Sequence, residues 1–101
     1  MRKLKGSDRK YLKGLAHHVK PVVQIGKSGV TGSVIETVRQ ALDAHELIKI
    51  RFIEHKEEKR ALFDEIAQKT KSHGVGMIGH IAIFYRQHPD AEKRKIHLPL
   101  N

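Results

Sequence analysis

The residues whose types and spacing best fit a chemical task lie in the segment Gly26-Lys27-Ser28-Gly29. Two glycines three positions apart let the backbone turn sharply and leave no side chain to block a closely approaching molecule. Backbone N–H groups in such a turn, placed just before a helix, can donate to a phosphate. Lys27 would add a mobile cation and Ser28 a hydroxyl donor. These four residues alone fit either a phosphate-binding loop or a plain turn, and they lack the GxxxxGK[ST] pattern of a P-loop.

The net charge of the chain and its distribution indicate what kind of ligand the protein would bind. Its 101 residues are enough for one domain, and 20 Lys and Arg against 11 Asp and Glu give a net charge of +9. Residues 1–27 carry +7, residues 28–70 carry −1 and residues 71–101 carry +3. A basic excess at the two ends of the chain is typical of a surface that binds a polyanion. We favour nucleic acid over an anionic membrane, because no segment pairs this charge with a broad apolar face.

Several other functions are excluded by composition. The absence of cysteine excludes disulfides, thiolate zinc sites and a cysteine nucleophile. The longest apolar run, Ile81–Tyr85, is far shorter than the roughly 20 residues that span a bilayer, and no apolar run follows the basic N-terminus as in a signal peptide. The eight histidines form no HxxxH or HExxH pattern. Most acidic residues are interspersed with basic ones, which favours solvated ion pairs over catalytic carboxylates. We therefore expect a cytoplasmic protein with no metal, no cofactor and no enzyme activity.

Hydrophobic spacing and turn residues predict seven elements in the order α-β-α-β-α-β-β. They place helices over residues 7–18, 31–45 and 56–71, and strands over residues 22–25, 47–53, 75–78 and 81–86. Ser7 is the expected cap of the first helix, and either Thr31 or Ser33 that of the second. Gly79-His80 fits the two central positions of a type II′ hairpin turn.

The strand over 47–53 indicates how the elements pack. Its apolar residues alternate with Lys49 and Arg51, as expected of a strand covered on one side only. We therefore predict an α/β fold, a two-layer sandwich with a four-stranded mixed sheet and one sheet face partly open. Residues 87–101 are polar and interrupted by proline, which predicts a partly loose tail or an extended edge segment.

Several segments together resemble one known family. The stretch KPVVQIGKSGVT at residues 20–31, followed later by LIKIRF and IFYR, resembles the CRM domain (chloroplast RNA splicing and ribosome maturation). The length is similar to that of the stand-alone bacterial, YhbY-like form, and the resemblance spans residues 3–98. The family's L-Y-R ending appears as Phe84-Tyr85-Arg86, which keeps the tyrosine and the arginine.

The resemblance implies a fold and a function. It implies a single domain over residues 1–98, similar to the C-terminal domain of translation initiation factor three, with the helices on one face of a four-stranded sheet. It also implies RNA binding through a basic surface that includes the GxxG loop, as in KH domains, where such a loop clamps about four nucleotides. Bacterial members are associated with precursor large ribosomal subunits, so we expect ribosomal RNA as the partner of a monomeric protein that binds no membrane.

The candidate RNA-binding residues combine this loop with basic residues around it. They are Gly26, Lys27, Ser28, Gly29, Arg9, Lys10, Lys13, Lys20 and Arg86. Three alternatives stay open at this stage. The N-terminal basic run could be a solubilising tail, Arg86 could contact an acidic neighbour, and the whole protein could be an adaptor that docks an acidic protein partner by its basic face.

Overall fold

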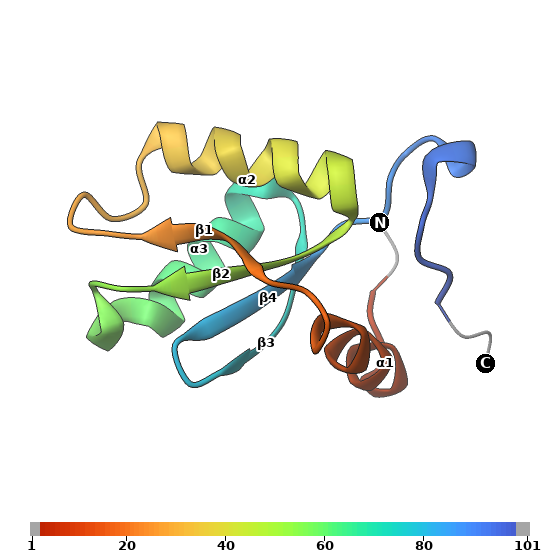
Figure 1. The fold of residues 1–101 in the computed structure, drawn as a ribbon, viewed down its shortest axis with the longest axis horizontal. Coiled ribbons are helices and arrows are strands. Elements are labelled where there is room, and N and C mark those ends of the chain that lie inside the picture. The colour runs from red at the N-terminus through yellow and green to blue at the C-terminus, as the bar shows by residue number, and fades with distance from the viewer. Residues whose placement is uncertain (1–2, 99–101) are drawn as a thin grey trace.

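The computed structural model describes residues 3–98, which form three α-helices and one four-stranded sheet (Figure 1). The elements are, in chain order, α1 (Gly6–Ala16), β1 (Pro21–Ile25), α2 (Gly32–His45), β2 (Leu47–Phe52), α3 (Lys59–Thr70), β3 (His73–Ile78) and β4 (Ile81–Tyr85). Two 3₁₀ turns, Lys56–Glu58 and Ala91–Lys93, precede α3 and follow β4. The predicted order α-β-α-β-α-β-β is confirmed.

The sheet is mixed, as predicted, with the strand order β1-β2-β4-β3. β1 and β2 are parallel, because the chain returns through α2 between them. β4 lies antiparallel to both β2 and β3. Gly79, at the first central position of the β3–β4 turn, has φ +60°, the left-handed region that a type II′ turn requires.

The two faces of the sheet carry separate hydrophobic clusters. Ile48, Ile50 and Phe52 of β2 belong to the cluster that contains the buried residues of α2 and α3. Leu47, which points to the opposite face by strand alternation, belongs to a second cluster that contains Leu12 of α1. Helices therefore pack against both faces of the sheet.

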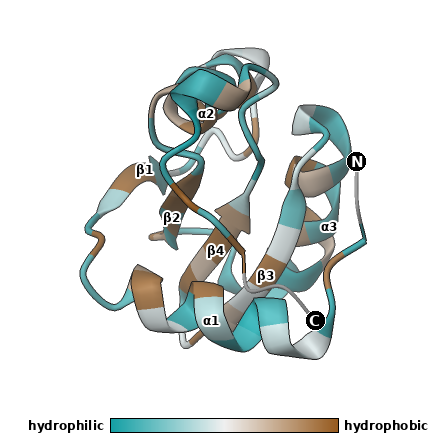
Figure 2. Cartoon of the chain, turned by 90° about the vertical axis from the view of Figure 1, so that its right-hand side faces the viewer, coloured by the Kyte–Doolittle hydropathy of each residue, from teal (hydrophilic) through white to brown (hydrophobic). Residues whose placement is uncertain are grey.

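The expectation that all helices lie on one face is wrong for α1. Ile83 and Tyr85 of β4 are apolar residues of the second face and must also be covered; they are buried there against Leu12 and Ala16 of α1. In Figure 2, the strands carry much of the hydrophobic colour, and α1 lies at the end of the sheet nearest the viewer. At this end the protein has three layers instead of the predicted two, whereas the rest of the α1 face is open.

The first helix also begins earlier than Ser7, its predicted cap. The helix starts at Gly6, and the backbone N–H of Lys5 donates to the buried carboxylate of Asp8 at 3.0 Å. Asp8, the acidic residue of the first turn, caps this end of the helix by accepting that N–H. Ser7 therefore lies inside the first turn and is not the cap. The predicted third helix begins instead with the 3₁₀ turn Lys56–Glu58.

The segment after β4 returns along the end of the sheet and is held by Glu46. This residue follows α2, is 1% exposed, and its carboxylate accepts backbone N–H groups from His88 at 2.7 Å, Lys95 at 2.6 Å and Ile96 at 2.9 Å. Ile96 also packs against the α1 cluster. The part of the C-terminal segment that the structure describes, residues 87–98, is therefore neither a sheet strand nor detached from the body.

Candidate nucleic-acid interface

The GxxG segment forms a tight turn at the end of β1. The N–H of Gly29 donates to the carbonyl of Gly26 at 3.0 Å, and Gly29 has φ +71°, which L-amino acids rarely adopt. Lys27 and Ser28 are exposed at the tip. A methyl group at Gly26 would meet no atom within 4 Å, so its surface is free for a ligand to approach.

The start of α2 adds a favourable electrostatic field. Thr31, and not the alternative Ser33, is the N-cap: its hydroxyl accepts from the Val34 N–H at 3.1 Å. The first turn of α2 holds no acidic side chain. The positive end of the helix dipole is therefore uncompensated by a carboxylate in that turn, two residues beyond Gly29, and this arrangement favours an anion.

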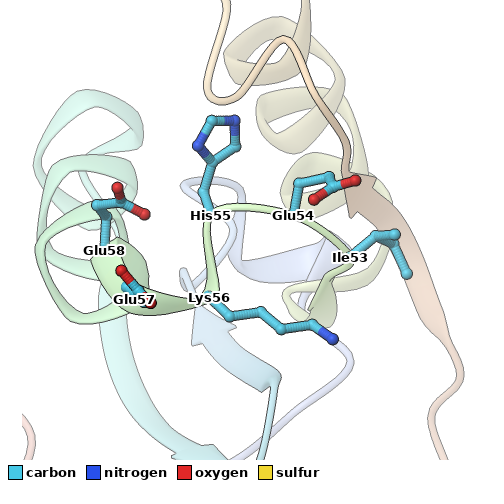
Figure 3. A pocket seen from close by; sticks show the side chains of 6 residues that line it. All are labelled: Ile53, Glu54, His55, Lys56, Glu57 and Glu58. Carbon is cyan, nitrogen blue, oxygen red and sulfur yellow. The ribbon is translucent and has the colours of Figure 1, made fainter.

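A second loop braces this turn. Nε2 of His55 lies 2.8 Å from the carbonyl oxygen of Lys27 and, since a carbonyl only accepts, it must carry the hydrogen. Ile53 and Glu54 both donate their N–H groups to the carbonyl of Ile25, at 3.0 and 3.1 Å. Figure 3 shows the imidazole of His55 pointing toward the loop that follows β1. The shape of the GxxG turn thus depends on residues about 28 positions further along the chain.

The bracing loop also lines an open cavity of about 400 Å³, whose walls include three glutamates. Glu54, Glu57 and Glu58 line it, together with Lys56 (Figure 3). Their negative charge repels a phosphate chain on this side of the loop. We therefore expect a bound polyanion to leave the GxxG turn away from the acidic 3₁₀ turn.

The predicted basic residues of α1 are separated from the loop by the length of β1. α1 and the GxxG turn lie toward opposite ends of the sheet in Figure 1. Lys10, Lys13 and Lys20 are exposed, but Arg9 donates from Nη1 to the carbonyls of Gly74 at 2.6 Å and Val75 at 3.4 Å. Arg9 is therefore engaged in packing α1 against β3.

Arg86 also makes structural contacts. Its guanidinium donates to the carbonyl of Thr70 at 2.6 Å, to the carbonyl of Arg39 at 3.2 Å and to the carboxylate of Asp43 at 2.7 Å. Its backbone N–H donates to the carbonyl of Glu46, just before β2, whereas the GxxG turn lies beyond the other end of that strand. At about 3.3 Å per residue, the length of β2 separates Arg86 from the GxxG turn by roughly 20 Å. The structure supports the acidic-neighbour alternative for Arg86.

Three residues near the candidate site were not among the sequence candidates. His55 gave no signal, because its contact with Lys27 depends on a left-handed backbone at φ +59° that no local pattern indicates. Lys49 and Arg51 do give a signal, their alternation with apolar residues, but by itself this pattern indicates only that the sheet is partly exposed. In the β1–β2 register Arg51 lies beside Gln24, near the GxxG end of β1, whereas Lys49 lies beside Pro21 at the other end of the strand.

The described residues offer neither a metal site nor a membrane-spanning helix. Within residues 3–98, no group of three or more His, Asp or Glu side chains is placed to hold a metal ion. No helix in this range is both long and apolar enough to cross a membrane.

Comparisons with known proteins agree with this geometry. Residues 4–86 match the CRS1 / YhbY (CRM) domain family. The chain is 40% identical over 100 residues to a Haemophilus influenzae protein named "RNA-binding protein", covering 98% of each chain. It is 32% identical over 97 residues to a Bacillus subtilis protein named as a probable RNA-binding protein, covering 95% of this chain and 99% of the relative.

A solved structure shows the same fold. The solution structure of a Staphylococcus aureus protein superposes with a TM-score of 0.81 at 32% identity, covering 96% of this chain and all of that one, 100%. The two named relatives are described by binding and not by catalysis, in agreement with the prediction of a non-enzyme. Sequence and fold agree over nearly the full length, so this chain belongs to the CRS1 / YhbY (CRM) domain family.

Proposed function

We propose that this protein binds RNA, with the GxxG turn as its phosphate contact. The observation that supports this most directly is the exposed Lys27-Ser28 tip, placed beside the acid-free N-terminus of α2. Gly26 and Gly29 let the RNA backbone approach closely, and Lys27 and Ser28 contact a phosphate. The names of the two relatives support the choice of RNA as the ligand.

We also propose a specific role for this RNA binding, in assembly of the large ribosomal subunit. The family resemblance supports it: residues 1–98 act as one domain, as a monomer in the cytoplasm, on ribosomal RNA of precursor large subunits. The exposed side chains of Lys10, Lys13 and Lys20 extend the basic surface. Arg9 and Arg86 could reach a phosphate only by breaking their hydrogen bonds to backbone carbonyls, so we assign both a structural role.

The mechanism predicts a salt-dependent affinity. Capture of about five phosphates releases their counterions, so log K falls with log salt at a slope of roughly −3.5 on single-stranded RNA. Aromatic stacking contributes little, because the chain has only 5% aromatic residues and Tyr85, Phe52, Phe63 and Phe84 are buried. Recognition then depends on the RNA backbone and on shape.

The decisive test is the double variant Lys27→Asp/Ser28→Asp, measured against large-subunit ribosomal RNA over a range of salt. It places negative charge where we place phosphate and leaves both glycines and the core unchanged. We expect at least a tenfold loss of affinity, about 1.4 kcal/mol, and a shallower salt slope. The control Ala91→Asp/Lys93→Asp makes the same change in charge at exposed positions of the C-terminal 3₁₀ turn and should bind as the wild type does.

Two outcomes would reject the proposal. Wild-type affinity in the folded loop variant, with circular dichroism as the check on folding, would make the GxxG segment a plain turn. Binding of the protein to its cellular partner that survives ribonuclease would favour the adaptor that docks an acidic protein.

A further inference from the structure

Part of the sheet face that carries α1 is left open. On this face α1 buries Ile83, Tyr85 and Leu47 at one end of the sheet. Beyond α1, Val22 near the start of β1 is 45% exposed, and Ile78 at the GxxG end of β3 is 57% exposed. This open area, which we call the sheet track, lies between the GxxG turn and α1.

The sheet track is basic and contains no acid. None of the four strands contains Asp or Glu, whereas β2 contributes Lys49 and Arg51. Alternation with Ile48, Ile50 and Phe52, which face α2 and α3, places both cations on the track. Among the residues that the structure describes, no hydrogen bond or ion pair engages either side chain, in contrast to Arg9 and Arg86.

The strand register arranges these residues in two rows. Arg51 is paired with Gln24 on β1 and with Ile81 on β4, and Ile81 is paired with Ile78 on β3. This row crosses all four strands next to the GxxG turn. It presents a cation and an amide beside an aliphatic surface.

The second row leads to α1. Lys49 is paired with Ile83, and Ile83 with Gly76 of β3. The side chain of Lys13 lies against Gly76: a methyl group there would be 2.7 Å from Cε of Lys13. Cations therefore follow one another from Lys27 through Arg51 and Lys49 to Lys13.

We infer that the sheet track binds a single strand of RNA that leaves the GxxG turn and runs over β1 and β2 toward α1. This deepens the proposed function and rests on it. The acid-free, unpaired cations match a chain of phosphates, and the exposed aliphatic side chains offer contact to ribose and base faces. The glutamates beside His55 repel the strand from the other side of the loop, so the track is the favoured exit.

The test uses the double variant Lys49→Gln/Arg51→Gln, which removes both charges and keeps a polar side chain at each position. Its matched control is Lys71→Gln/Lys93→Gln, which removes two exposed charges outside the track. The probes are oligouridylates of about four and about twelve nucleotides. The short one fills the GxxG turn alone. The long one can also follow β2, which at about 3.3 Å per residue is roughly 20 Å long, or about six nucleotides at about 3.4 Å each.

We expect the track variant to lose about tenfold in affinity for the long probe and to change little for the short one. Its salt slope on the long probe should be shallower by about 1.4, because two phosphate contacts are lost. The control should bind both probes as the wild type does. In NMR spectra, the amides of Gln24, Lys49 and Arg51 should shift with the long probe only, which tests the track without any substitution.

The possible failures are distinguishable. If the wild type binds ribosomal RNA but the track variant equals its control, or the long probe gains nothing over the short one, the track is rejected and the proposed function is retained. If the wild type binds no RNA, both are rejected. If polyglutamate competes as well as the long probe of equal charge, the track is a docking surface for an acidic protein segment instead.

Discussion

At the scale of single residues, Glu46 connects two distant parts of the chain. Its buried carboxylate accepts three backbone N–H groups from the segment that follows β4. Its own carbonyl accepts from Arg86, and its N–H donates to Leu42 at the end of α2. A buried acidic side chain is tolerated here because donors surround both of its oxygens.

Replacing this carboxylate tests its role in stability. In Glu46→Gln an amide NH₂ takes the place of one oxygen and faces a backbone donor, so a buried N–H loses its acceptor. We expect a loss of about 1–3 kcal/mol in the free energy of unfolding, measured by denaturant titration. The exposed Glu92→Gln serves as the control and should change little. Equal stability of the two variants would show that Glu46 does not hold the segment.

His80, in the β3–β4 turn, has a lowered pKa. Desolvation and then the positive charges of Lys59 and Lys56 lower its pKa below the ordinary value of 6.5. Nζ of Lys59 lies 3.2 Å from Nδ1 of His80 and also donates to the carbonyl of Gly79 at 2.7 Å. An ammonium group only donates, so this contact requires Nδ1 without a proton.

The pKa shift predicts a pH dependence with a definite sign. The fold disfavours the charged form of His80, so the unfolded chain takes up the proton at higher pH. The contribution of His80 to stability is therefore complete above about 6.5 and is lost as the pH falls through its folded pKa. In Lys59→Gln we expect the pKa of His80 to rise toward 6.5 in an NMR titration. In the distant variant Lys93→Gln it should stay as in the wild type, and an unchanged pKa in Lys59→Gln would contradict this account.

At the scale of elements, the two glycines of the GxxG turn have different tasks. Gly29 has φ +71°, and a methyl group there would lie 3.5 Å from Nε2 of His55. Gly26 has neither constraint and open space around it. Gly29 is therefore needed for the shape of the turn, whereas Gly26 is needed only if a ligand approaches closely.

This difference predicts separate effects of two single substitutions. Gly29→Ala should lower the free energy of unfolding by about 1–2 kcal/mol, because an L-residue is forced into the left-handed region. Gly26→Ala should keep wild-type stability and lower the affinity for RNA. Thermal unfolding and RNA titration of both variants check the two effects. An RNA affinity that Gly26→Ala leaves unchanged would show that no backbone approaches that position.

How far the elements could be predicted depends on the range of the interactions involved. Periodicity marks the strands and helices because each buries one face, and Gly79-His80 marks the hairpin by local backbone geometry. The position of α1 on the second face could not be predicted, because it depends on which residues of β4 need cover once the strand order is established. The brace from His55 to Lys27 and the clamp from Glu46 to Lys95 link residues 28 and 49 positions apart, and neither leaves a local pattern.

At the scale of the whole molecule, charge is divided between the two sides of the sheet. The strands contain cations and no acids, whereas the 3₁₀ turn before α3 and α3 itself balance four acids with four cations: Glu57, Glu58, Asp64 and Glu65 against Lys56, Lys59, Arg60 and Lys69. The net charge of +9 therefore understates how basic the α1 side is. A polyanion is therefore attracted to the α1 side more strongly than to the α3 side, which orients the protein before any specific contact forms.

The contact of Arg9 with β3 covers part of an exposed edge of the sheet. β3 is an edge strand, and exposed strand edges are templates on which a second molecule can add its own strand. Arg9 occupies the carbonyls of Gly74 and Val75, and the register shift between Gly74 and Gly76 distorts the same stretch. Many copies gathered on one long polyanion would meet at high local concentration. With two of its carbonyls occupied and its backbone distorted, the β3 edge is a poor template for pairing with such a neighbour.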